Sequence, residues 1–182
     1  MISKRLIIAF VLAACLSGCG EKRTFPASRL QQPIGNFSFV TPEGWSRTKL
    51  AGIDFIVVST KPDSGIRPNI FIDFVRPATQ LSNTVAEVVK TNRDKLPAYQ
   101  VLQQVNFTTE SGLTGVKLTA SRLNKEALPL ALFHYFIQDA DRAIVITCIC
   151  ADATKLKYEP VFDSALKSLR SEKPTNKSTN GF

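Results

Sequence analysis

The chain is poor in the side chains that most often carry catalysis or bind metals. It has one histidine, His134, and one methionine, the initiator Met1. A Ser-His-Asp site needs a nucleophile and an acid around its histidine, and no Gly-x-Ser-x-Gly sequence supplies the nucleophile. A phosphate-binding loop is missing too, because Gly112 and Gly115 are not followed by Gly-Lys-Ser/Thr. We therefore expect no enzymatic activity and no cofactor.

Cysteine is also scarce in the part of the chain that should fold. Cys148 and Cys150 lie in the apolar run 143–150, which is typical of a buried strand. Residues two apart on a strand lie about 6.6 Å apart, whereas the Cβ atoms of a disulfide lie about 3.5–4.5 Å apart. We therefore expect these two thiols not to be bonded to each other.

A soft-metal site of His134, Cys148 and Cys150 depends on the register of the hairpin between them. A three-residue turn pairs Gln138 with Arg142 and places His134 on the cysteine face, whereas a slip of one residue places it on the other face. The sequence leaves both registers open. Since no second histidine or internal methionine completes the ligand set, we expect no metal site.

The N-terminus has the main long apolar run, from Leu6 to Leu16, and this run is too short to span a bilayer, which takes about 20 apolar residues. Lys4 and Arg5 precede it and small residues follow it, as in a secretory signal. The run therefore predicts export, with residues 1–18 as the signal peptide.

The stretch Leu16-Ser17-Gly18-Cys19 resembles the lipobox of bacterial lipoproteins. The resemblance implies that Cys19 becomes the first mature residue and carries a diacylglyceryl thioether with acyl chains such as palmitate. Two acyl chains anchor a protein stably, so we expect a lipid-anchored protein of the cell envelope that faces the periplasm. Gly20 stands where an inner-membrane retention signal often has Asp, which favours the outer membrane. The alternative is an ordinary secretory signal with a chance cysteine.

The charge balance is basic. Loss of Lys4 and Arg5 with the signal lowers the formal charge from +8 to +6. An exported protein does not meet nucleic acid, so the partners that fit are anionic lipid headgroups, cell-wall polymers or acidic protein surfaces. A solvated basic surface explains the same charge without a dedicated patch.

Hydrophobic patterning predicts one domain over residues 36–170, preceded by a lipidated tether over 19–35 and followed by a disordered tail over 171–182. The expected strands alternate or are wholly apolar, and the two expected helices have a 3.6-residue period. The predicted order is strands 37–40, 54–60 and 69–75, a helix 82–96, strands 99–109, 113–123, 130–138 and 142–150, and a helix 158–170.

Local signals support these elements. Thr41-Pro42-Glu43-Gly44 suits a type I turn that delivers Trp45 to the core. Thr84 and Glu87 have capping-box spacing, Pro97 ends the first helix, and Pro160 suits the first turn of the second. The predicted fold class is α+β, with an antiparallel sheet of about six or seven strands flanked by helices.

The segment from Phe37 to Trp45, with its Pro-x-Gly-Trp turn, resembles the opening of the PsbP-like fold group, and the later elements follow in that group's order. The group includes Ran-release factors and bacterial lipoproteins of the DcrB type. The resemblance implies an α/β/α sandwich and an accessory or binding role, with no shared site to carry over.

Two functions from different classes fit these features. The first is a membrane-anchored, non-catalytic accessory or protein-interaction domain with an envelope protein as its partner. The second is a carrier of a small apolar ligand or lipid, which needs an internal pocket.

Overall fold

The structure is a computed structural model of the 182-residue chain. It describes residues 29–32, 37–50, 53–75, 80–139 and 142–171. The strands of the main sheet are β3 (Trp45–Leu50), β4 (Ile53–Ser59), β5 (Asn69–Val75), β6 (Gln100–Thr108), β7 (Thr114–Leu123), β8 (Pro129–Asp139) and β9 (Arg142–Ala151). They form one seven-stranded antiparallel sheet in the order β3-β4-β5-β9-β8-β7-β6.

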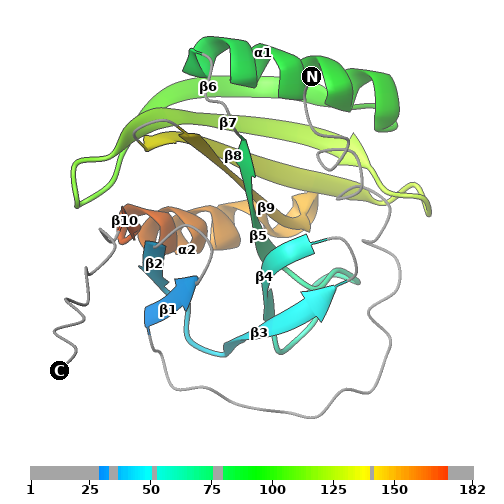
Figure 1. Ribbon diagram of the computed structural model, residues 1–182. Helices are drawn as coiled ribbons and strands as arrows, with labels where there is room; N and C mark the ends of the chain where they lie inside the picture. The colour runs from blue at the N-terminus through cyan, green and yellow to red at the C-terminus, as the bar shows by residue number, and fades with distance from the viewer. Residues whose placement is uncertain (1–28, 33–36, 51–52, 76–79, 140–141, 172–182) are drawn as a thin grey trace, which may run out of the picture.

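The two helices cover opposite faces of this sheet (Figure 1). They are α1 (Leu81–Lys95) and α2 (Lys155–Lys167). Beside α2 lies a small sheet of β1 (Arg29–Gln32), β2 (Phe37–Val40) and β10 (Arg170–Ser171), with β2 in the middle. The layers confirm the predicted α+β sandwich. Neither of the helices in the described residues combines the length and apolar character that a membrane crossing requires.

The central hairpin of β8 and β9 is apolar on both faces, because each face is covered. The register pairs Phe133 with Cys148 and His134 with Thr147, so alternate residues face α2 and α1. Every residue from Leu130 to Ile137 is buried. This explains the wholly apolar runs that the sequence shows in both strands.

The α2 side holds the larger core, and its packing is aromatic. Phe162 of α2 contacts the rings of Trp45 and Phe133 with ring centroids 5.9 and 5.6 Å away. Phe37 and Phe39 of β2 close the same core from the small sheet. A fully buried aromatic or aliphatic side chain stabilises the fold by about 1.5–3 kcal/mol, so this layer dominates the packing energy.

The α1 side is thinner and less uniformly apolar. Val88 packs on Leu118, Phe136 and Val145 of the sheet. The positions one turn to either side of Val88 on this helix face are Thr84 and Asn92, and both are buried.

The turn before Trp45 differs from the predicted type I turn. The N–H of Trp45 donates to the carbonyl of Pro42 at 3.2 Å, so the turn starts at Pro42 and Gly44 is its third residue. Gly44 has φ +73°, which is the requirement of a type II turn at that position. Trp45 is buried and starts β3, as its predicted core role demands.

The predicted capping box at Thr84 is wrong. The helix begins at Leu81 with Gln80 as its N-cap, and no side chain caps it. Thr84 is therefore inside the helix, where its side chain faces the sheet. The end of the helix follows the prediction: Leu96 is extended with ψ 129°, because a residue before proline avoids helical ψ.

The last helix starts earlier than residue 158. A 3₁₀ turn at Asp152–Thr154 leads into α2 at Lys155, so Pro160 lies inside the helix rather than in its first turn. Proline has no N–H, and the carbonyl of Leu156 loses its helical donor there.

Three strands were not predicted. β3 is a polar edge strand, and β1 and β10 have four and two residues, too few for a periodicity signal. β1 lies within the 19–35 stretch treated as a tether, and Ser171 of β10 lies in the 171–182 stretch treated as a tail.

Candidate functional site

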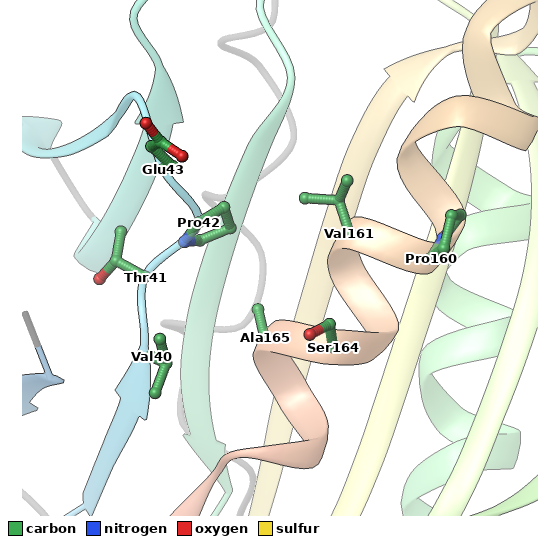
Figure 2. A pocket seen from close by; sticks show the side chains of 8 residues that line it. All are labelled: Val40, Thr41, Pro42, Glu43, Pro160, Val161, Ser164 and Ala165. Atoms are coloured by element: carbon green, nitrogen blue, oxygen red, sulfur yellow. The ribbon is translucent and has the colours of Figure 1, made fainter. Parts of the chain in front are cut away.

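A groove lies between α2 and the turn that follows β2 (Figure 2). Its volume is about 470 Å³. One wall comes from β2 and its turn, the other from α2. The lining residues are Val40, Thr41, Pro42, Glu43, Pro160, Val161, Ser164 and Ala165.

Two hydrogen bonds of Ser168 hold the walls in place at the C-terminal end of α2. Its hydroxyl donates to the carbonyl of Ala165 at 2.6 Å and accepts from the N–H of Val40 at 2.8 Å. Ser168 thereby ties β2 to the helix. The short chain from Val40 through the Pro42 turn then fixes the opposite wall.

The groove is open and mainly apolar. Val40 is 41% exposed and is one of the few large exposed apolar side chains among the described residues. Pro160 and Ser164 are also exposed, and Glu43 is the one ionisable residue in the lining. An open, mainly apolar lining of this kind suits binding.

The opposite flank of α2 carries an ion cluster. Lys117 of β7 donates to Glu159 at 2.7 Å and to Asp163 at 2.8 and 2.9 Å. Tyr135 donates to Asp163 at 2.6 Å, and burial is the main reason that the pKa of Tyr135 is raised. The cluster fixes the rotation of α2 and thus which residues face the groove. Lys117 lies inside the predicted strand 113–123, and a lysine at such a position is the sequence signal that could have indicated the ion cluster.

A third contact fixes the start of α2. Asp63, in the turn between β4 and β5, accepts from Lys157 at 2.6 Å and from Tyr158 at 3.1 Å. The hydrogen bond from Lys157, followed by that from Tyr158, lowers the pKa of Asp63. This carboxyl group is therefore held as an anion by a structural contact.

The hairpin register excludes the metal site of His134 with the two cysteines. Gln138 pairs with Ala143, which is the slipped register, so His134 faces α1 whereas Cys148 and Cys150 face α2. Within the described part of the chain, no three His, Cys, Asp or Glu residues are arranged to hold a metal.

The two cysteines are free and buried in the core, as predicted. Burial raises the pKa of the Cys150 thiol to about 12 and that of Cys148 well above its ordinary range. Both remain thiols at neutral pH. Since the thiolate is the reactive form, neither is a nucleophile here.

Cys19, the predicted lipidation site, lies outside the described residues, as does the signal sequence. The groove itself was not foreseen. Pro42 and Pro160 were each assigned a local role, and no sequence pattern showed that they would line the same groove.

No protein-family model and no curated protein sequence matches the chain. Solved structures do match. Cyanobacterial PsbP (CyanoP) from Synechocystis is 14% identical with a TM-score of 0.63, over 86% of this chain and 98% of that one. The Ran-binding protein Mog1p of Saccharomyces cerevisiae is 11% identical with a TM-score of 0.55, over 81% and 96% of the two chains.

A third similar structure is LpqN of Mycobacterium tuberculosis, described as involved in cell envelope biogenesis. It is 13% identical with a TM-score of 0.54, over 78% of this chain and 88% of that one. At these identities the likeness concerns the fold alone. The chain has the PsbP/Mog1-like α+β fold, in agreement with the resemblance of its opening strand and turn.

Proposed function

We propose that the protein is a lipid-anchored lipoprotein of the bacterial envelope that acts as a non-catalytic interaction domain. The groove between α2 and the Pro42 turn is its contact surface. The observation that carries this proposal is an open apolar groove whose walls are fixed from three sides, by Ser168, Lys117 and Asp63. A preformed surface binds without the entropy loss of ordering itself.

The partner that fits is an envelope protein that inserts a short apolar segment. Apolar anchors in a pocket with a polar rim are the usual centre of such a contact. Val40, Pro160 and Val161 offer the apolar surface, and Ser164 and Glu43 offer hydrogen-bonding groups at its edge. LpqN, which has a similar fold, is described as acting in cell envelope biogenesis, and this supports an envelope role.

In this proposal the lipobox-like stretch anchors the domain at the membrane through Cys19, and the domain faces the periplasm. The absence of Asp at position 20 favours the outer membrane. Anchoring raises the effective concentration of the domain for other envelope proteins. A groove of modest area then suffices for a specific contact.

A second candidate is the carrier function, and the groove volume of about 470 Å³ is the observation that favours it. Pockets of about 300–1,000 Å³ hold small molecules. The open wall and the exposed Val40 and Pro160 favour a protein segment over an enclosed ligand.

The test is photo-crosslinking in intact cells. A photoreactive amino acid replaces Ser164 in the groove, and a matched control variant carries it at Ser82, an exposed serine of α1 on the other face of the sheet. We expect a discrete protein adduct from position 164 and none from 82. A small molecule copurifying in a 1:1 ratio, with no adduct, would replace this proposal with the carrier function. Equal adducts from both positions would remove the groove as the contact surface.

A further inference from the structure

A second polar region lies on the other face of the sheet, beneath the C-terminal half of α1. Four side chains form it: Asn92 of α1, Tyr99 just before β6, Arg122 of β7 and His134 of β8. We call it the α1 polar cluster. All four are at least nine-tenths buried, with exposed fractions of 1, 8, 7 and 0%.

Five polar side-chain atoms of the cluster lack partners in the described structure. Both amide atoms of Asn92, the hydroxyl of Tyr99, Nε of Arg122 and Nε2 of His134 make no hydrogen bond of good geometry, although the side chains of Asn92 and Tyr99 interact with each other. Buried polar groups in folded proteins are nearly always satisfied by protein, ordered water or a ligand. The orphaned atoms of these neighbouring side chains therefore leave hydrogen-bonding capacity that a polar ligand could use.

The four side chains act on one another, which places them in one region. The rings of Tyr99 and His134 are 6.1 Å apart between centroids. Burial raises the pKa of Tyr99, while the hydrogen-bonding contact with Asn92 and the positive charge of the exposed Arg93 lower it to a smaller extent. The pKa of His134 is lowered to about 4, first by burial and then by the positive charge of Arg122.

The charge of the cluster is unbalanced. Arg122 is buried, and its one hydrogen bond in the described structure is a long one of 3.4 Å from Nη1 to the carbonyl of Leu123. No ion pair between described residues includes it. His134 is neutral at pH 7, and its Nδ1 lies 2.9 Å from the hydroxyl of Thr147. The cluster thus holds one buried cation without a counterion.

We propose that the α1 polar cluster binds a small, singly charged carboxylate. Arginine presents its N–H donors in a fork that matches a carboxylate, and one cation balances one anion. Asn92 and Tyr99 supply further hydrogen-bonding groups from α1 and from the segment before β6.

The segment Leu96–Tyr99 borders the cluster. It joins α1 to β6, and Ala98 within it has a left-handed φ of +53°. A backbone bond of 3.0 Å from Leu123 N to Pro97 O ties it down directly beside Arg122. This site lies on the face of the sheet opposite the α2 groove and does not depend on the function proposed for that groove.

The chain provides its own reporter for a binding experiment, since His134 is the one histidine in the sequence. Its imidazole ring signals are therefore unique in an NMR spectrum. The purified protein is titrated with sodium formate at pH 7, and sodium chloride at equal ionic strength is the reference. The thermal midpoint is measured in the same two series.

The test variant is Arg122→Met, which keeps an unbranched apolar stem and removes the charged guanidinium group. The matched control is Arg170→Met, at an exposed arginine of β10 in the other layer. We expect formate to move the His134 signals saturably and to raise the thermal midpoint above the chloride series, in the native protein and in Arg170→Met alike. Arg122→Met should show neither effect.

Three results would overturn the proposal. The first is a native protein in which formate and chloride act equally, which would mean that water alone fills the cluster. The second is an undiminished formate response in Arg122→Met. The third is an equal loss of response in both variants. Should Arg122→Met not fold, Arg122→Lys takes its place, and we expect it to weaken the formate response at least tenfold because lysine lacks the fork.

Discussion

Tyr135 donates a 2.6 Å hydrogen bond to Asp163, and the same carboxylate accepts from Lys117. Through these hydrogen bonds β7 and β8 fix the rotation of α2 about its axis. Lys117 is 7% exposed at its side chain, whereas Glu159 and Asp163 are 34% and 30% exposed. The lysine is the buried member, and the carboxylates border solvent.

Lys117→Met should therefore lower the free energy of unfolding by about 1–3 kcal/mol, below the 3–5 kcal/mol of a fully buried pair, because water can rehydrate the freed carboxylates. Urea unfolding measures the change. Lys157→Met, which removes an exposed partner of Asp63, should leave the midpoint almost unchanged. Equal losses in the two variants would show that burial of Lys117 has no energetic consequence.

Trp45→Ala should lower the free energy of unfolding by about 3–5 kcal/mol, because the side chain is buried against Tyr158 and Phe162. Chemical denaturation followed by circular dichroism is the measurement. Val40→Ala at an exposed apolar position is the matched control, and its loss should stay below about 0.5 kcal/mol. A loss below about 1 kcal/mol for Trp45→Ala would place the indole outside the core.

Gly115→Ala should be among the most damaging single-methyl changes in the chain. A Cβ at this position would lie 1.9 Å from the carbonyl oxygen of Phe136, so β7 and β8 would have to separate. We expect a loss of at least about 1–3 kcal/mol, visible as a lower urea midpoint. Gly112→Ala meets no atom within 4 Å, and its positive φ should cost about 1 kcal/mol. A larger loss of stability for Gly112→Ala than for Gly115→Ala would contradict the strand register.

Stability should fall as pH falls from about 6.5 to about 4. His134 has its pKa lowered to about 4 from an ordinary 6.5, so between these values the unfolded chain binds a proton that the folded chain excludes. This difference in proton binding contributes about 3 kcal/mol to the free energy of unfolding. The contribution is fully present above pH 6.5 and lost by pH 4. The pKa of Asp63 lies below its ordinary 3.8, so protonation of Asp63 lowers stability only at lower pH. Unfolding free energies of the native protein and His134→Gln between pH 4 and 7 should diverge in slope. Parallel profiles would show that His134 does not titrate as its burial requires.

The parts of this fold that the sequence predicted are those with long periodic patterns. Strands β4 to β9 and both helices have apolar patterns long enough to identify. The alternation at Phe37 and Phe39 identified the short β2, and the Pro-x-Gly-Trp turn resembled that of the fold group. β3 was missed because Ser46, Arg47 and Thr48 are polar on an edge strand, where the guanidinium of Arg47 lies 4.9 Å from the ring of Phe55. Local patterning does not distinguish such a strand from a loop.

The candidate sites were harder to foresee, because each joins residues that are distant in sequence. The groove needs Val40 beside Ala165, and the α1 polar cluster needs Asn92 near His134. A one-residue difference in the β8–β9 hairpin decided whether His134 faced the cysteines. Register is a property of the whole sheet, so sequence reasoning could name both outcomes and choose neither.

The anchor itself is open to a direct prediction. Cys19→Ala should leave an unprocessed precursor that incorporates no labelled fatty acid, because the thioether requires the thiol. Cys15→Ala, four residues earlier in the predicted signal, is the control and should mature normally. Normal maturation and labelling of Cys19→Ala would disprove the lipobox assignment.

We propose that the α2 groove contacts a partner and that the predicted membrane anchor brings the two together. The most direct test compares the adduct formed by the photoreactive residue at position 164 in two forms of the protein in intact cells. One form is the native chain with its predicted lipidation site, and the other is exported with a cleavable signal that lacks Cys19. We predict a single adduct whose yield falls at least tenfold in the unanchored form at equal abundance. An undiminished adduct in that form would contradict the role of the anchor, and no protein adduct in either form would contradict the interaction itself.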